Sequence, residues 1–176
     1  NKPYATISGE KAVTDYLEKK NQTAQVSYKQ NPAPYYQIKF KISDPPPLVS
    51  ILIPSKNSFQ MIARCLESIY NKSSYKNFEI ILIDHQSDEQ KCLELFAHYK
   101  QTKNNFFVQN FTGIFNFAKM NNLAAQNAKG KYLLLLNNDI EVKSPDWIEQ
   151  LVGLTQQPDV GAAGGMLLYP NQKIQH

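Results

Sequence analysis

The sequence predicts an α/β fold with a mostly parallel sheet and helices on both of its faces, and three observations lead to it. From residue 48 onward, apolar runs of strand length alternate with helical patterns. These runs are continuously hydrophobic, which is typical of strands buried on both faces of a parallel sheet. Polar residues follow the ends of the runs, and open α/β sheets bind their ligands there.

Residues 1–47 are predicted to be an extension or linker that differs from the rest. A short helix is expected after Ser8, followed by a stretch rich in Gln, Asn and Lys. Residues 35–42 alternate in the manner of an exposed strand. The run from Asp44 to Pro47 contains three prolines, which enforce an extended connection. We therefore expect a domain boundary there, with residues 48–176 as the main domain.

The main domain is expected to contain strands and helices in alternation. Strands are predicted at residues 49–53, 78–83, 106–109 and 132–136, and helices at residues 58–70, 88–99 and 115–129. Gly130 is expected to end the third helix, and Asp88 to cap the second. A further helix is expected to open at Ser144 and Pro145, because serine is a good N-cap and proline suits the first helical position.

The composition excludes several classes of protein. With 42% hydrophobic residues the chain can build a core of ordinary domain size, so a disordered or fibrous protein is excluded. The formal charge of +4 is spread along the chain. Arg64 is the single arginine, so the guanidinium groups that bind guanine edges with two hydrogen bonds are nearly absent. No nucleic-acid partner is therefore expected. Cys65 and Cys92 are predicted to be packed free thiols in a reducing compartment.

No apolar run approaches the roughly 18 residues of a membrane-spanning helix, and the N-terminus lacks the order of a signal peptide. A cytoplasmic protein is therefore expected. Because the sequence starts without Met and stops without a terminating signal, we also expect it to be a fragment of a longer chain.

The candidate ligand-binding residues follow the predicted strands. They are Pro54, Ser55 and Asn57 after the first strand, Asp84 after the second, and Asn137, Asn138 and Asp139 after the fourth. Mg²⁺ or Mn²⁺ needs oxygen ligands but often takes only one or two from protein, with phosphates and water as the rest. Asp139 with a neighbouring amide is thus predicted to hold a metal-bound diphosphate. His85 is expected to be an exposed loop histidine.

Two common nucleotide-binding classes are disfavoured because their loops are absent. The sequence contains neither G-x-G-x-x-G nor G-x-x-x-x-G-K-[ST]. A dinucleotide-dependent dehydrogenase and a P-loop NTPase therefore do not fit, whereas a nucleotide diphosphate held mainly by a metal does.

Five segments then stand in a fixed order, at residues 47–54, 83–87, 115–122, 136–139 and 158–175. The first looks like an opening strand, the second like a V-D-N-G-S strand end, and the fourth falls on a metal-binding D-x-D. Together they resemble the family 2 glycosyltransferases of the Rossmann-like GT-A fold, especially bacterial rhamnosyltransferase-like members. The resemblance covers essentially all of residues 48–176.

The resemblance implies an inverting, metal-dependent transfer of a sugar from a nucleotide-diphosphate sugar to an acceptor hydroxyl, in surface polysaccharide synthesis. It implies a glycan or lipid-linked acceptor and is compatible with peripheral association of the full-length chain with the inner face of the membrane. Pro54, Ser55 and Asp84 would surround the base, with Asn57 nearby. The remaining donor contacts would come from Asn116, Asn122, Lys119 and Asn138, and the metal ligands from Asp139 and Asn137. The general base is expected after His176, so this part is expected to bind the donor and to transfer little or no sugar.

Three positions depart from the family's pattern. Asn137 replaces the first Asp of D-x-D, which removes a charge from the metal site. His85 and Gln86 stand where Asn and Gly are usual, and the loss of glycine restricts the backbone of that turn. These departures keep open a non-catalytic scaffold with the same fold. A nucleotidyltransferase is a second alternative, but residues 55–60 lack the glycine- and basic-rich loop that it should show.

Overall fold

The computed structural model describes residues 3–30 and 33–175, which belong to two compact units. One unit is Asp44–Trp147, and the other combines Asn1–Ser43 with Ile148–His176. The sheet unit thus starts within the proline-rich run of the sequence. The division of the chain into domains after Pro47 stays a prediction.

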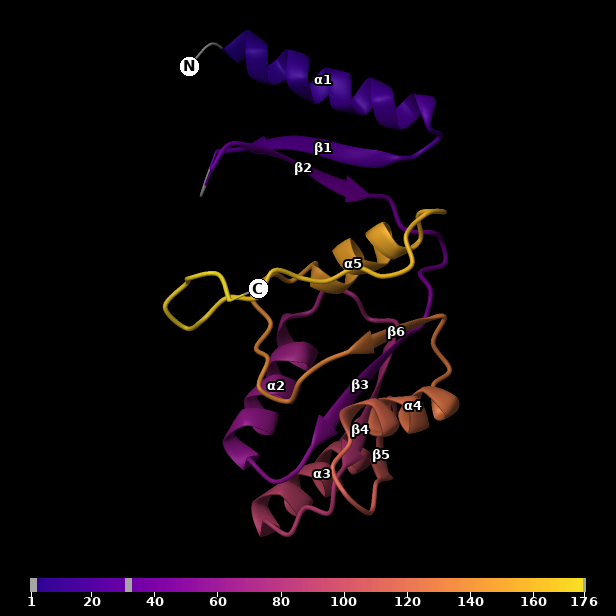
Figure 1. The fold of residues 1–176 in the computed structure, drawn as a ribbon, viewed down its shortest axis with the longest axis vertical. Helices are drawn as coiled ribbons and strands as arrows, with labels where there is room; N and C mark the ends of the chain where they lie inside the picture. Colours follow the sequence, from indigo (N-terminus) through magenta and orange to yellow (C-terminus); the bar gives the residue numbers. More distant parts are fainter. Residues whose placement is uncertain (1–2, 31–32, 176) are drawn as a thin grey trace. The chain divides into compact units, whose positions relative to one another are not determined.

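The sheet unit is built on four parallel strands in the order β5-β4-β3-β6 (Figure 1). The strands are β3 Val49–Ser55, β4 Phe78–Asp84, β5 Phe106–Asn110 and β6 Tyr132–Leu135. Every residue of β3 and β4 is buried, as their continuous apolar runs predict. The register sets Ser55 beside Asp84, and Asp84 beside Asn110. The polar strand ends therefore meet at one edge of the sheet.

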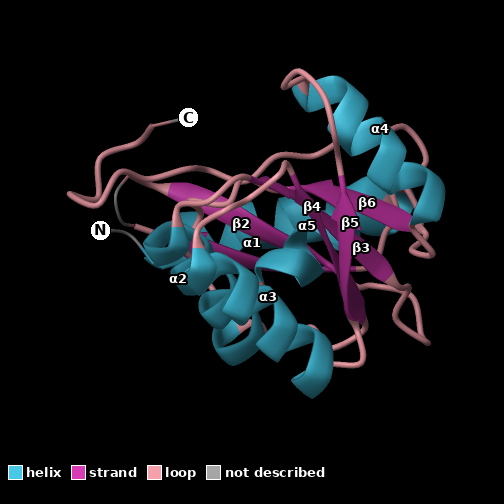
Figure 2. Ribbon diagram, turned by 90° about the horizontal axis from the view of Figure 1, so that it is seen from below, coloured by secondary structure: helices cyan, strands magenta, loops and turns pink. Residues whose placement is uncertain are grey.

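Helices cover both faces of this sheet, which confirms the predicted fold class. The helices are α2 Phe59–Lys72, α3 Gln90–Thr102 and α4 Phe117–Asn127. Figure 2 shows α2 and α3 on one side of the strands and α4 on the other. Beneath α4 lies a core that includes Leu52, Ile83 and Met120. Each such side chain stabilises the fold by about 1.5–3 kcal/mol relative to its exposed state.

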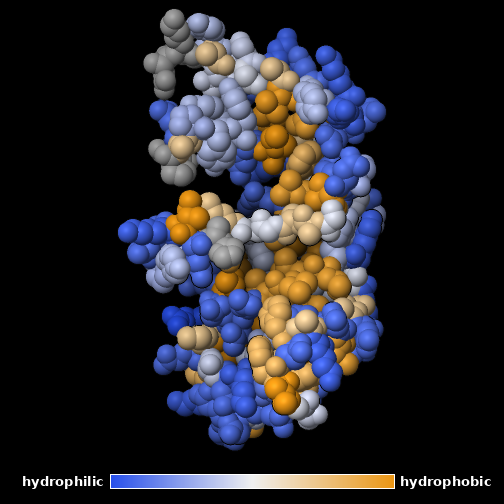
Figure 3. Space-filling view, in the orientation of Figure 1, coloured by the Kyte–Doolittle hydropathy of each residue, from blue (hydrophilic) through white to orange (hydrophobic). Residues whose placement is uncertain are grey.

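Burial on both faces is wrong for β6. Leu133 is 47% exposed and Leu135 is 54% exposed, and apolar residues gather in the region of β6 in Figure 3. Among the described residues β6 pairs with β3 alone, and α4 packs on β3 and β4. The sequence pattern of a buried strand and that of an uncovered apolar edge strand are the same, so the pattern alone does not separate them.

The turn from α4 into β6 depends on a close approach to β3. Ser50 donates to a carboxylate oxygen of Glu79 over 2.6 Å, and the Gly130 amide donates to the Ser50 hydroxyl over 2.8 Å. A Cβ at position 130 would lie 2.5 Å from the Ser50 amide nitrogen. Only glycine fits there without a backbone shift.

Helices α3 and α5 begin later than predicted. The N-cap of α3 is Glu89, without a side-chain cap, so the expected Asp88 cap is wrong. The helix α5, Trp147–Thr155, begins after the predicted Ser144 and Pro145. The Pro145 carbonyl accepts instead from the Ser74 amide over 2.9 Å. 

The other unit contains α1 Pro3–Lys19, a hairpin of antiparallel strands β1 Ala24–Lys29 and β2 Tyr35–Phe40, and residues 148–155 of α5. The helix starts before the predicted Ser8. Strand β1 was not expected, because its segment is polar. A Cβ at Gly9 would clash with the Tyr36 hydroxyl, so α1 approaches β2 closely there. No helix in the described ranges has the length and apolar content needed to cross a membrane.

Candidate functional site

The strand ends surround a hollow of about 200 Å³, here called the strand-end hollow. Its lining residues come from the ends of β3, β4 and β6 and from the start of α4: Pro54, Ser55, Lys56, His85, Phe115, Phe117, Met120, Asn137 and Asn138. Four of these were predicted as site residues from the sequence, namely Pro54, Ser55, Asn137 and Asn138.

A larger and shallower hollow of about 470 Å³ lies at the opposite edge, where the strands begin. Several of its polar groups are bonded to one another or to backbone. The Tyr70 hydroxyl donates to Asn105, whose amide donates to the Phe78 carbonyl, and the Lys76 ammonium donates to the Ser73 carbonyl. Because four predicted site residues line the strand-end hollow and none lines the larger one, we place the candidate site at the strand-end hollow.

Asp84 is fixed at the end of β4 by bonds from both sides. Its side chain is 8% exposed, and one carboxylate oxygen accepts from the Ser87 amide over 3.1 Å. Its carbonyl accepts from the Phe111 amide over 2.8 Å. The carboxylate therefore has a defined orientation and keeps acceptor capacity, since a carboxylate accepts about four hydrogen bonds.

Asn57 joins the turn after β3 to the turn after β4. Its Oδ1 accepts from the amides of Asp88 and Glu89, each over 3.0 Å. Its Nδ2 donates to the Asp88 carboxylate over 2.7 Å, and its own amide donates to the Ser87 hydroxyl over 2.8 Å. The side chain that was predicted to lie near a nucleotide thus holds the two turns together.

The turn after β4 keeps a glycine-like backbone without a glycine. Gln86 has a φ of 55°, in the left-handed region that favours glycine. For an ordinary L-residue this conformation costs roughly 1–2 kcal/mol. The turn therefore forms without glycine at position 86, and the cost is backbone strain at Gln86.

His85 is buried, so the expectation of an exposed loop histidine is wrong. Its side chain is 7% exposed, and its Nε2 lies 2.8 Å from the Gly113 carbonyl oxygen. The rings of Phe111 and Phe115 each have centroids 5.8 Å from the imidazole. A segment 26 to 30 residues further along the chain covers His85. The sequence around His85 carries no sign of this.

Ser55 and Asn138 connect the first and last strands of the site. The Asn138 amide donates to the Ser55 hydroxyl over 3.1 Å, although 83 residues separate them. Asn137 and Asp139, the predicted metal ligands, are exposed on either side of Asn138. The hydrogen bond brings the predicted base-binding and metal-binding segments together.

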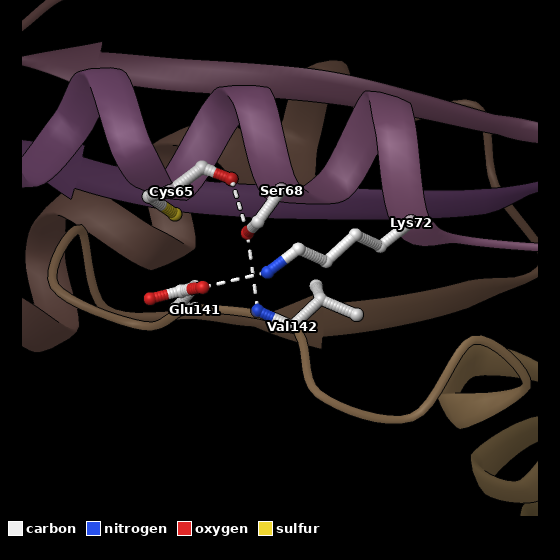
Figure 4. Close-up of polar contacts among 5 residues, drawn as sticks. All are labelled: Cys65, Ser68, Lys72, Glu141 and Val142. Carbon is white, nitrogen blue, oxygen red and sulfur yellow. Dashed lines mark hydrogen bonds and ion pairs between the residues drawn. The ribbon is translucent and has the colours of Figure 1, made fainter. Parts of the chain in front are cut away.

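Helix α2 holds the segment that carries Asp139. The Ser68 hydroxyl donates to the Cys65 carbonyl over 2.9 Å and accepts from the Val142 amide over 3.0 Å (Figure 4). Lys72 pairs with Glu141 over 2.6 Å, and this ion pair lowers the pKa of the Glu141 carboxyl. Residues 137–142 are thus tied to α2, although Asn137, Asp139 and Glu141 are exposed.

Cys65 and Cys92 are both buried and free, which confirms the prediction of packed thiols. The Cys65 thiol donates to the Asn137 carbonyl over 3.8 Å. Burial, with a contribution from the Asp139 charge, raises its pKa to about 12. A protonated, buried thiol is a poor metal ligand.

The donor set near Asp139 is made of oxygen atoms. Within residues 3–30 and 33–175 no three His, Cys, Asp or Glu side chains gather in a way that could hold a metal. One exposed carboxylate beside amide oxygens fits a Mg²⁺ or Mn²⁺ whose other ligands are phosphate and water. It does not fit a cation bound by protein alone.

The residues at the start of α4 and within it that were expected to contact the donor differ in their contacts and exposure. Asn116 is the N-cap of α4, and its Oδ1 accepts from the Lys119 amide over 2.9 Å. The Lys119 ammonium lies 6.0 Å from the centroid of the Phe111 ring. Asn122 is exposed. Its neighbour Asn121, which the sequence reasoning missed, is 4% exposed and has a buried Oδ1 with no hydrogen-bond partner.

Four predicted residues line the hollow together with side chains that were not predicted. The other lining residues were missed: Lys56, His85, Phe115, Phe117 and Met120. All of these except Lys56 belong to the five ordered segments. Asn57, Asp84, Asn116, Lys119, Asn122 and Asp139 do not line it. The roles of these six residues therefore stay predictions.

Curated relatives of this chain are much longer than it is. It is 34% identical over 173 residues to the O-antigen biosynthesis protein RfbC of Myxococcus xanthus, which is 98% of this chain and 13% of RfbC. It is 33% identical over 175 residues to the protein y4gI of Sinorhizobium fredii, which is 99% of this chain and 19% of that protein. The chain thus spans less than a fifth of either relative.

Solved structures share the fold. The mannosyltransferase PcManGT of Pyrobaculum calidifontis, in complex with GDP-Man and Mn²⁺, aligns with a TM-score of 0.61 at 16% identity over 95% of this chain and 45% of its own. Staphylococcus aureus TarS, residues 1–349, aligns with a TM-score of 0.53 at 24% identity over 61% of this chain and 32% of its own. Residues 50–176 match the family model described as Glycosyl transferase family 2. By this match and by its relatives, the chain belongs to glycosyl transferase family 2.

Proposed function

We propose that this chain is the donor-binding part of a longer glycosyltransferase, which transfers a sugar with inversion from a nucleotide-diphosphate sugar to an acceptor hydroxyl. The observation that carries the proposal is the Asn138 to Ser55 hydrogen bond of 3.1 Å, since it joins the ends of strands β3 and β6 around one hollow. Relatives named for O-antigen biosynthesis and for chondroitin synthesis support a role in polysaccharide formation.

In this proposal the nucleobase lies at the end formed by Pro54, Ser55 and Asp84. The Asp84 carboxylate accepts one hydrogen bond from the Ser87 amide and can accept more. In this proposal it also accepts a hydrogen bond from an imino N–H of the base. Ligand pockets usually have about 300–1,000 Å³. The strand-end hollow of about 200 Å³ is smaller, so it takes part of the nucleotide.

The diphosphate lies toward Asn138, with Asp139 and Asn137 as ligands of Mg²⁺ or Mn²⁺. Bound there, the metal supplies positive charge that stabilises the departing nucleoside diphosphate. Asn116 and Asn122 face the ribose or the diphosphate from α4, and the exposed Lys119 adds charge near the phosphates. The Mn²⁺ complex of PcManGT, which has a similar fold, supports a divalent cation as the cofactor.

The proposal assigns the general base to another part of the longer protein. Such a base must take the proton of the acceptor hydroxyl. Glu141 follows the metal segment but pairs with Lys72, which lowers the pKa of its carboxyl and makes it a weaker base. A glycan or a lipid-linked glycan is the proposed acceptor.

Asp139→Ala tests the metal role. In isothermal titrations of the full-length protein with UDP and with GDP, each with and without MnCl₂, the wild type should bind one of the two only with metal. The variant should lose that binding. Asp159→Ala is the matched control, because it removes an exposed aspartate that has no proposed role.

Unchanged binding by Asp139→Ala would contradict the metal role. The alternative function is a non-catalytic scaffold with the same fold, and the observation in its favour is Asn137 in place of a second carboxylate. Failure of the wild type to bind either nucleotide with Mg²⁺ or Mn²⁺ would favour the scaffold.

A further inference from the structure

The loop of residues 111–116 is attached to the sheet at its two ends. At its start the Phe111 amide donates to the Asp84 carbonyl over 2.8 Å, and at its end Asn116 caps α4. Between these points the side chains are exposed, with Ile114 at 93% and Phe115 at 61%. Exposed apolar side chains contribute little to holding a loop in one conformation.

His85 supplies the contact in the middle of this loop. Its Nε2 is 2.8 Å from the Gly113 carbonyl oxygen. A carbonyl oxygen only accepts, so Nε2 carries the proton and donates, whatever the state of the other ring nitrogen. Gly113 has a φ of 108°, which an L-residue rarely adopts. The carbonyl is therefore directed at His85 by a backbone conformation that glycine permits.

The ring of His85 also contacts the ring of Phe115. The two rings have centroids 5.8 Å apart, and both line the strand-end hollow with Pro54 and Ser55. The backbone of His85 is itself held, because its amide donates to the Ser55 carbonyl over 2.8 Å. A chain of contacts thus runs from β3 through His85 to the aromatic wall of the hollow.

We infer that His85 is a positioning residue for the donor: its bond to Gly113 keeps Phe115 in the wall against which the planar base packs. This inference rests on the proposed donor binding. Stacking of a base on an aromatic side chain changes affinity by roughly 5- to 150-fold, which is the equivalent of about 1–3 kcal/mol. The contact with Phe115 is a partial one, so a change near the lower end of that range is expected.

Two substitutions separate the hydrogen bond from the bulk of the ring. His85→Phe keeps an aromatic ring but has no donor, whereas His85→Gln places an amide nitrogen near the position of Nε2. Titrations of the full-length protein in MnCl₂ would use UDP, GDP and inorganic pyrophosphate as probes. His85→Phe should weaken the nucleotide about tenfold and leave pyrophosphate unchanged. His85→Gln should recover most of the loss.

Phe115→Ala is a second variant that does not depend on folding around position 85, because Phe115 is largely exposed. It should show the same selective loss of the nucleotide. If both His85→Phe and Phe115→Ala bind the nucleotide with wild-type affinity, the inference about His85 is overturned and the proposed function is not affected. Equal weakening of pyrophosphate and nucleotide would also overturn it, because a general structural role predicts that result. A wild type that binds no probe would overturn the proposed function together with this inference.

Discussion

The two ends of the candidate site are built differently. The proposed base end, here Asn57, Asp84 and Ser87, is bonded internally before any ligand arrives. The proposed metal end, residues 137–139, exposes Asn137 and Asp139 and is held through backbone groups and Asn138. Substitutions at the base end should therefore affect folding and binding together, whereas Asp139 should affect binding alone.

The largest effect on stability is expected for Asn57→Ala. The variant loses three side-chain hydrogen bonds and places alanine at a φ of 52°, so we expect a loss of about 3 kcal/mol in the free energy of unfolding. Asn57→Gly loses the same bonds without the backbone strain and should recover about 1 kcal/mol. Chemical unfolding followed by fluorescence of the single tryptophan, Trp147, measures both. Equal losses in the two variants would remove backbone strain from the explanation.

Asp84→Ala should cost about 2 kcal/mol of unfolding free energy, because the bond between a buried carboxylate and the Ser87 amide is lost. Asp139→Ala is the comparison at the metal end, and as an exposed substitution it should stay within about 0.5 kcal/mol of the wild type. Chemical unfolding followed by Trp147 fluorescence measures the free energy of unfolding of both variants. A loss at Asp139 as large as that at Asp84 would show that the two ends do not differ in this way.

Alkaline pH should loosen the metal end through Cys65. Folding raises the pKa of this thiol from 9.0 to about 12, so the stability that it contributes is complete below pH 9 and is lost as the pH rises toward 12. The expected loss is about 1.4 kcal/mol at about pH 10. Cys65→Ala removes the titrating group, and its stability should fall less steeply between pH 9 and 11. If the unfolding free energies of the wild type and of Cys65→Ala fall in parallel with pH, Cys65 is not the group responsible for the loss.

The smallest effect concerns the turn after β4. Gln86→Gly relieves a positive φ at an exposed position and adds chain freedom to the unfolded state, so a net gain of roughly 0.5 kcal/mol is expected. Thermal unfolding should show a small rise in Tm. A fall in Tm would mean that the Gln86 side chain contributes more to the turn than the strain costs.

The sequence predicted the features that depend on local pattern. Strands β3 and β4 follow from continuous apolar runs, and Ser55 and Asp84 follow from their places directly after them. The burial of His85 was missed because it depends on a bond to Gly113, far along the chain. The bonds of Asn57 were missed for the same reason, since they join two turns that only the sheet brings together.

Strand β6 affects how this protein must be handled in solution. On one side it pairs with β3, and among the described residues no strand pairs with its other side. An open strand edge beside exposed Leu133 and Leu135 is a template for pairing between molecules. Concentrated samples in which this edge stays uncovered will tend to associate. The substitution Leu135→Lys would oppose that association with charge while leaving the backbone pairing to β3 intact.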